Sequence, residues 1–237
     1  ISPNYLICNN IMRDSLKRNA HTDFIVYVIN KALSPSTRVI LNADDLICCS
    51  VADANVNKVY FGIDADKPKI WDDSAPRDIY YCPICGNKLE AEYIRYNHIG
   101  RFNCSGCNYS SPERNYIVTD IDKINNEFTI EHNGTYNKYR LINDNIVNVY
   151  NFCGAIALLS ELGLSYEQIS KALNKQKIVK SRYDSLTAGK LNITMQLAKG
   201  QNPIACARAY SYVSKCPADK KSLLIMVDDK SDNNGNS

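Results

Sequence analysis

The chain has 237 residues, of which 45% are apolar and 22% are charged, and its formal net charge is only +3. This composition is that of a globular protein, with enough sequence for one large domain or two modest ones. The small net charge argues against non-specific nucleic-acid binding, no apolar run approaches the ~20 residues that span a bilayer, and the N-terminus lacks the features of a signal peptide.

The N-terminal part of the chain alternates between strand and helix patterns. The apolar run at 4–8 predicts a strand that ends in polar residues, and residues 11–19 and 22–33 have helical spacing. Two further apolar runs, at 38–45 and 58–64, predict buried strands with a short helix between them. Alternation of this kind predicts a mostly parallel, doubly wound α/β sheet.

Two cysteine pairs interrupt this pattern after a polar stretch. The sequence has ten cysteines, and Cys82, Cys85, Cys104 and Cys107 form two Cys-x-x-Cys pairs. Each pair places two sulfurs on one tight turn, so the four predict a tetrahedral zinc site; ordinary thiols or two disulfides are the alternatives. Four thiolates leave no open position on the metal, so the site is expected to be structural, and His98 is interpreted as a surface or packing residue.

The other six cysteines are scattered along the chain, four of them in apolar settings. They are expected to be free, buried thiols.

Turn and capping signals define the elements that follow the cysteine pairs. The Asn133–Gly134 dipeptide lies within β-type alternation and predicts a hairpin. Residues 147–162 predict a buried helix that ends at a glycine, and the residues after it carry a capping box that opens a helix at 166–174.

From about residue 180 the pattern indicates the start of a second α/β domain. A strand is predicted at 191–198, a helix at 203–215 and a strong strand at 221–229.

Four segments, taken in order, resemble elements of the Mur ligases, the ATP-dependent amide-forming enzymes of peptidoglycan synthesis. They are "VILNADD" (39–45), "NVYN" (148–151), "ELGLSYEQISKALN" (161–174) and "SRYD" (181–184). The embedded cysteine ribbon, "YCPICG" followed by "HIGRFNCSGC", is similar to that of the MurT branch of these ligases.

The resemblance implies a domain organisation. Residues 1–179 correspond to a central ATPase domain that lacks the half with the phosphate-binding loop, and residues 78–113 to a zinc-ribbon insertion within it. Residues 180–237 correspond to the first part of the C-terminal domain. No Gly-rich loop ending in Gly-Lys-Ser or Gly-Lys-Thr occurs in the sequence. The chain is therefore interpreted as a fragment that does not hydrolyse ATP alone.

The resemblance also implies an activity. A MurT-like synthetase uses ATP and Mg²⁺ to activate the α-carboxylate of the D-glutamate in the lipid II stem peptide. Ammonia from a GatD-type glutaminase partner then attacks the acyl phosphate. The implied location is the cytoplasmic face of the membrane.

Several residues match positions with roles in the family. Asn42 matches an adenine-contacting asparagine, and Asp45 either lines that pocket or begins the next helix. Arg182 matches an arginine at the domain junction, where a guanidinium can fork onto phosphate oxygens. Asn202 matches the asparagine of a C-terminal "NP" element.

Two further matches remain open. Asn148 and Asn151 match a pair of helix asparagines, for which capping and packing are equally good interpretations. Asp228 or Asp229, after the last predicted strand, is the candidate for an aspartate that completes the partner's catalytic triad.

Three other functions are compatible with parts of the pattern. One is a Mur-ligase-like amide ligase of other specificity, such as one acting on folate or cyanophycin. The second is a zinc-ribbon module that binds nucleic acid. The charge balance of the ribbon argues against it, because its acidic residues offset its basic ones. The third is a non-catalytic interaction scaffold.

Overall fold

The structure is a computed structural model, and it describes residues 3–13, 21–52, 57–68, 78–142, 144–176, 183–196, 210, 213–214 and 216–225. The chain forms two compact units. The larger comprises 1–13 and 20–178, and the smaller comprises 14–19 and 179–237. Whether these units are the two predicted domains stays a prediction.

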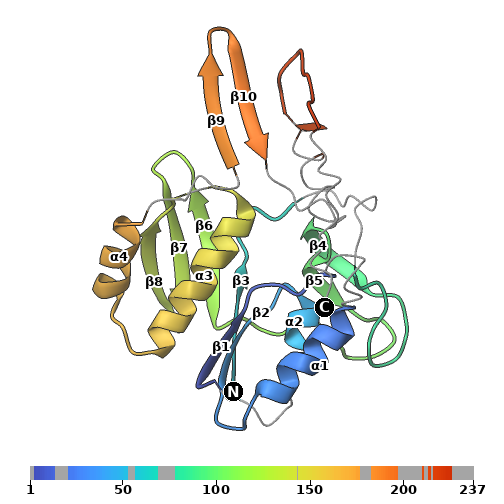
Figure 1. The fold of residues 1–237 in the computed structure, drawn as a ribbon. Coiled ribbons are helices and arrows are strands. Elements are labelled where there is room, and N and C mark those ends of the chain that lie inside the picture. Colours follow the sequence, from blue (N-terminus) through green and yellow to red (C-terminus); the bar gives the residue numbers. More distant parts are fainter. Residues whose placement is uncertain are drawn as a thin grey trace, which may run out of the picture. The chain divides into compact units, whose positions relative to one another are not determined.

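A six-stranded sheet in the order β1-β2-β3-β6-β7-β8 organises the larger unit (Figure 1). Its strands are β1 (Tyr5–Cys8), β2 (Arg38–Asn42), β3 (Lys58–Ile63), β6 (Tyr116–Asp122), β7 (Glu127–His132) and β8 (Thr135–Arg140). The first four strands in this order run parallel, and β7 and β8 add antiparallel neighbours. The predicted mostly parallel α/β sheet is therefore confirmed.

Helices cover both faces of this sheet because the strand residues alternate between two apolar clusters. The helices are α1 (Thr22–Ala32), α2 (Leu46–Cys49), α3 (Ile146–Glu161) and α4 (Tyr166–Asn174). Ile40 and Phe61 belong to the cluster that contains α3 and α4, whereas Val39 and Leu41 pack with α1 and α2. Within the described ranges, no helix combines the length and the apolar character needed to cross a bilayer.

The predicted turn and cap chemistry is confirmed. Asn133 and Gly134 have φ values of 50° and 76° and join β7 to β8, as a two-residue hairpin turn requires. Gly163 takes φ = 85° just after α3, a conformation that glycine adopts without a Cβ penalty. Ser165 and Gln168 form the complete capping box of α4.

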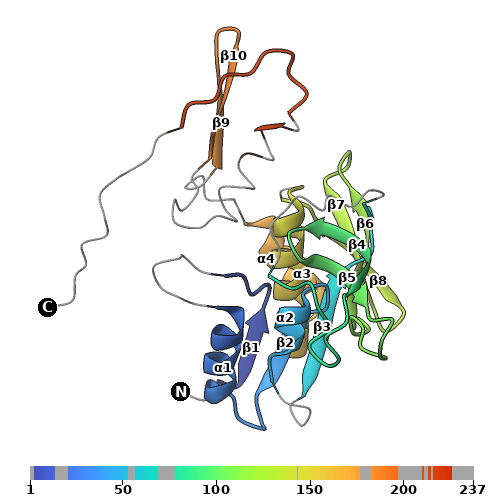
Figure 2. The same cartoon turned by 90° about the vertical axis from the view of Figure 1, so that its right-hand side faces the viewer.

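The cysteine segment folds as an insertion between β3 and β6. It contains the hairpin β4 (Glu90–Tyr96) and β5 (Ile99–Asn103), which forms a separate two-stranded sheet (Figure 2). The apolar cluster of the ribbon includes Leu46 from α2, so the insertion packs against the sheet domain and is not a free appendage.

The smaller unit contains a hairpin of β9 (Tyr183–Ala188) and β10 (Leu191–Gln196), with Gly189 at φ = 60° in the turn. The strand at 191–198 was expected, but β9 was not. Leu186 is the only large aliphatic residue of β9, and its strand structure depends on pairing with β10.

Two other predictions are wrong within the described residues. No strand forms at 221–225, and residues 11–13 are not helical. An apolar run becomes a strand only when a neighbour accepts its backbone hydrogen bonds, and no described strand pairs with 221–225. The helix predicted at 203–215 lies mostly outside the described residues.

Close packing of α3 on the sheet gives a stability prediction. A Cβ atom on Gly154 would lie 2.7 Å from Asn9 Oδ1 and 2.8 Å from Phe61 Cζ. Gly154→Ala is therefore expected to lower the free energy of unfolding by about 1–3 kcal/mol through overpacking. Urea titration measures this free energy, with Ala155→Ser on the same helix as the control. Equal midpoints for Gly154→Ala and the native chain would contradict the close packing at Gly154.

Candidate functional site

The four paired cysteines meet at the end of the ribbon remote from the β4–β5 turn. Their sulfur atoms all lie within 4.8 Å of one another. Sγ of Cys82 is 3.6 Å from that of Cys107, and Sγ of Cys85 is 3.4 Å from that of Cys104. The prediction that both pairs converge on one site is confirmed.

The thiols of this cluster are suited to a soft dication. Desolvation raises the pKa of Cys82, but the N–H groups of Cys85 and Ile84 outweigh it and bring that pKa to about 7. The Tyr109 N–H lowers the pKa of Cys107, whereas desolvation and the neighbouring thiols raise it to about 12. A bound cation removes this mutual repulsion. Four sulfurs at these separations fit a structural, four-coordinate zinc ion with no position left for catalysis.

Of the five described cysteines outside the cluster, three are buried and two are partly exposed, and all five are free thiols. Cys8 and Cys48 lie with their sulfurs 3.2 Å apart between β1 and α2, and Cys153 is a buried residue of α3. Burial raises the pKa of Cys48 well above its usual value, which makes it a poor nucleophile. Cys206 lies outside the described residues.

A second group of polar side chains gathers where β2 ends, and Asp44 is its centre. The Asp44 side chain is fully buried. Nε and Nη2 of Arg114 lie 3.1 and 3.0 Å from its Oδ1. Its Oδ2 accepts hydrogen bonds from the Ile63 N–H at 3.0 Å and from the Tyr150 hydroxyl at 2.7 Å. Four donor groups, from β3, α3 and the segment just before β6, thus hold one carboxylate.

Burial and the neighbouring groups act in opposite directions on the charge of Asp44. Burial raises the pKa of Asp44 above its usual value, and Arg114, the Ile63 N–H and Tyr150 oppose that effect. The Asp44 carboxylate in turn outweighs desolvation at Arg114 and raises the pKa of the guanidinium, so Arg114 stays positive. Tyr150 keeps its proton because burial raises its pKa far above the usual value.

Arg114 also joins the ribbon to the sheet. Its Nη2 donates to the Tyr93 hydroxyl of β4 at 2.7 Å, and its Nη1 donates to Asp64 at 3.2 Å. The Tyr93 hydroxyl donates to the Ile63 carbonyl at the end of β3, and the Gly100 N–H of β5 donates to the Asp44 carbonyl. The ribbon hairpin is thereby fixed to the carboxyl ends of β2 and β3.

Asp45 has a different environment from its neighbour. As the N-cap of α2, its Oδ1 accepts from the N–H groups of Ile47 and Cys48, and its Oδ2 accepts from the Ile11 N–H. Burial raises the pKa of Asp45, but His98, Ile11 and Cys48 together bring it below the usual value. Of the two roles expected for Asp45, the structure shows helix capping; a role in a nucleotide pocket stays a prediction.

Three asparagines form the polar edge of the same region. The Asn42 side chain is fully buried, its Oδ1 accepts from the Asp44 N–H and its Nδ2 donates to the Asn9 carbonyl. Asn9 Nδ2 donates to Oδ1 of Asn151, which is exposed on α3. Both ends of the Asn42 amide already bond within the chain, and its proposed contact with adenine stays a prediction. Asn148 is half-buried in the first turn of α3.

Four residues expected at the site lie outside the described residues: Arg182, Asn202, Asp228 and Asp229. The sequence interpretation also missed three residues that the structure brings together: Asp44, Tyr150 and Arg114. The available signal was the doubled aspartate directly after a buried strand, because carboxyl ends of neighbouring parallel strands meet at one edge of a sheet. Nothing in the sequence relates Arg114 to Asp44, 70 residues away.

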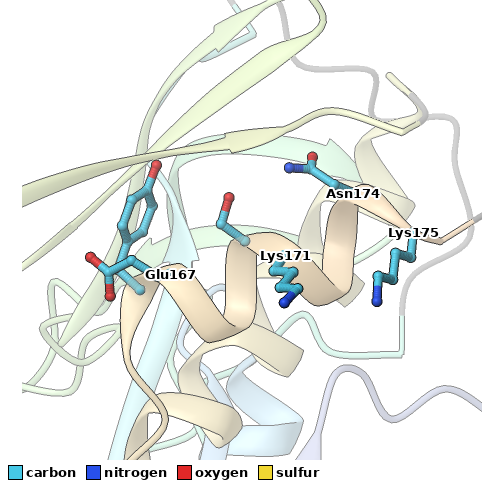
Figure 3. Close-up of a pocket in the computed structure, with 6 residues that line it drawn as sticks. Glu167, Lys171, Asn174 and Lys175 are labelled. Carbon is cyan, nitrogen blue, oxygen red and sulfur yellow. The ribbon is translucent and has the colours of Figure 1, made fainter.

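One surface depression lies elsewhere. It has a volume of about 460 Å³ and is lined by residues of α4, among them Glu167, Lys171, Asn174 and Lys175 (Figure 3). None of the predicted site residues lines it, and one helix face gives no convergent set of groups for catalysis.

No protein-family profile matches the chain. Among curated proteins, it is similar to the MurT subunit of the glutamine-hydrolysing lipid II isoglutaminyl synthase of Staphylococcus aureus. The identity is 25% over 240 residues, which cover 98% of this chain and 52% of that relative. The chain therefore spans about half the length of the relative, and its resemblance to MurT is confirmed.

Solved structures give the same fold. A pseudomurein peptide ligase type C from Methanothermus fervidus has a TM-score of 0.67 at 27% identity, covering 82% of this chain and 38% of that one. MurF from Acinetobacter baumannii has a TM-score of 0.53 at 16% identity, covering 90% of this chain and 38% of that one. The expected Mur-ligase-like α/β fold is confirmed.

The cysteine cluster gives a direct prediction. Cys104→Ser removes one of four thiolate ligands, so we expect the metal content of the purified chain to fall from about one zinc per chain to near zero, with earlier thermal unfolding. Elemental analysis measures the first and circular dichroism the second. Cys216→Ser is the matched control, because that thiol lies outside the cluster; unchanged zinc in Cys104→Ser would show that the four-thiolate assignment is wrong.

Proposed function

We propose that this chain is part of a MurT-type synthetase subunit that amidates the D-glutamate of lipid II. The observation that carries the proposal is the similarity to a MurT subunit over 98% of the chain. A four-cysteine ribbon inserted into a Mur-ligase-like sheet supports it.

The proposed reaction has two steps. The α-carboxylate of D-glutamate attacks the γ-phosphate of ATP, which forms an acyl phosphate and releases ADP. Ammonia then attacks the acyl carbon, phosphate leaves, and the excess proton passes to solvent, so the product is D-isoglutamine. A GatD-type glutaminase supplies the ammonia. Such chemistry depends on positioning and on stabilising phosphate charge, to which bound Mg²⁺ contributes by neutralising phosphate oxygens.

The arrangement of the described residues supports a nucleotide site in this proposal. Polar groups from β1, β2 and α3 converge at the carboxyl ends of parallel strands, where α/β proteins bind nucleotides. In the proposal, Asn42 contacts adenine while Asn9 stays in place beside it, and Asp45 lines the pocket. The Asp44–Arg114 pair holds the strand ends and does not touch the substrate.

The remaining assignments complete the proposal. Arg182 binds phosphate oxygens, Asn202 contributes to cofactor binding, Asp228 or Asp229 acts in the partner's active site, and the cysteine cluster holds structural zinc. Residues 1–179 are the central domain and residues 180–237 the start of the C-terminal domain. The enzyme acts in the cytoplasm on membrane-anchored lipid II.

A second candidate follows from the similarity to the pseudomurein peptide ligase. In that case the acyl phosphate is attacked by an amino acid or peptide amine, and no glutaminase takes part. The fold and the ATP chemistry are the same, so only the nucleophile distinguishes the two.

Substrate analysis separates these candidates. The complete reading frame, co-expressed with a GatD-type subunit, is expected to convert lipid II to its carboxamide in the presence of ATP, Mg²⁺ and glutamine. Mass spectrometry detects the product, and omission of glutamine is the control. Ligation of an amino acid without any amidation would contradict the first candidate and support the second.

The 237-residue chain alone is expected to hydrolyse no ATP, because its sequence contains no Gly-rich phosphate loop. A coupled phosphate-release assay measures this, with the complete reading frame as the positive control. Turnover by the chain alone at a rate comparable to that control would show that other residues bind the phosphates.

A further inference from the structure

The tip of the ribbon hairpin is buried, which is unusual for a two-residue turn. Asn97 and His98 join β4 to β5, and their exposed fractions are only 4% and 0%. Asn97 has φ = 49°, a left-handed conformation that asparagine tolerates better than most residues. The end of the hairpin opposite the cysteine cluster therefore packs against the sheet domain, and the imidazole of His98 is buried there.

His98 lies between two carboxylates. Its Nε2 is 3.4 Å from Asp45 Oδ1, and its Nδ1 is 3.8 Å from Asp78 Oδ2. The side chains of Asp45 and Asp78 are 0% and 6% exposed, so water screens these contacts little. Each ring nitrogen lies at ion-pair distance from a carboxylate oxygen, and both contacts are attractive only when both nitrogens carry protons.

The same two carboxylates hold one loop. Asp45 Oδ2 accepts from the Ile11 N–H at 2.9 Å, and Asp78 Oδ2 accepts from the Arg13 N–H at 3.0 Å. These two amides are two residues apart in the segment that follows β1. Asn9, which bonds to Asn42 and Asn151, begins that segment.

The charges around the ring favour the protonated form. The charged groups near it include Asp45 before α2, Asp78 at the first position of the ribbon, and Arg13, whose Nε is 3.4 Å from Asp78 Oδ1. Arg13 is half-exposed and balances only part of the negative charge. Two nearly buried carboxylates favour a further cation close by, and His98 lies in that position.

We propose that His98, as an imidazolium, is a positioning residue that fastens the metal-bound ribbon to the loop after β1. His98 holds the carboxylates of Asp45 and Asp78 in place, and these carboxylates hold the backbone amides of Ile11 and Arg13. The loop in turn keeps Asn9 beside Asn42, at the carboxyl ends of the parallel strands. The inference rests on the proposed function in one respect, namely that the site around Asn9 binds the nucleotide. The ribbon then contributes to the ligase site through His98, without taking part in the reaction.

The proposal fixes a direction of pH dependence. Two carboxylates favour the charged imidazole in the folded chain relative to the unfolded one. The stabilisation is therefore complete at low pH, within the range where the carboxylates stay ionised, and is lost as pH rises through the titration of folded His98. The loop is expected to loosen in that upper range.

Amide exchange measured by NMR on the zinc-loaded 237-residue chain tests the proposal. In His98→Gln, the protection of the Ile11 and Arg13 amides is expected to fall by about tenfold or more, the size expected for losing a charged hydrogen-bond partner. In the native chain this protection is expected to fall as pH rises through the titration of His98. In His98→Gln no such pH-dependent fall is expected. His132→Gln is the control and leaves both amides unchanged.

Asp78→Asn gives a second route if His98→Gln does not fold. It removes one negative charge beside the ring, so His98 is expected to lose its proton at a lower pH than in the native chain. Zinc content, measured in parallel, stays at the native level in both variants. Native protection of Ile11 and Arg13 in His98→Gln, or a neutral His98 ring from pH 6 upward in the native chain, would overturn the proposal.

Nucleotide binding by the complete reading frame separates this inference from the proposed function. Weaker ATP binding in His98→Gln with unchanged zinc supports both. If the native protein binds no ATP, the proposed function fails while the exchange experiment still decides the role of His98. If the native protein binds ATP and His98→Gln leaves both affinity and exchange unaltered, only the role of His98 is refuted.

Discussion

The buried pair of Asp44 and Arg114 is the constraint on which the rest of the larger unit depends. A carboxylate without solvent must be matched by donors, and Asp44 obtains them from β3, from α3 and from Arg114, just before β6. Arg114 also binds the Tyr93 hydroxyl of the ribbon. The order of the strands, the placement of α3 and the docking of the insertion therefore meet at one ion pair.

This arrangement explains how a four-cysteine ribbon becomes part of a domain with a Mur-ligase-like fold. One end of the ribbon is closed by four cysteines, and the other inserts His98 among acidic residues at the strand ends. The adjacent carboxylates Asp44 and Asp45 have pKa values shifted in opposite directions, because burial dominates at the first and favourable partners dominate at the second. The ribbon thus affects the charge state of Asp44 and Asp45, although both residues belong to the sheet domain.

Local sequence patterns predicted much of the fold. Where the structure differs from the prediction, the cause is a contact between residues that are not neighbours in the sequence. The hairpin turn at Asn133–Gly134 and the capping box at Ser165 depend on neighbours in sequence, so residue type sufficed. Strand β9 depends on pairing with β10, which residue type alone did not reveal. At the site, the cysteine spacing predicted its own cluster, whereas the contact of Arg114 with Asp44 and that of His98 with Asp45 exist only once the ribbon has docked.

A double-mutant cycle on Asp44 and Arg114 tests the central claim most directly. The free energies of unfolding of Asp44→Asn, Arg114→Gln and the double variant are compared with that of the native chain by urea titration. Each single change leaves a buried charge without its partner and is expected to cost about 3–5 kcal/mol, while the double variant costs clearly less than the sum. Additive losses, with a coupling energy near zero, would contradict the view that this ion pair holds the sheet, α3 and the ribbon together.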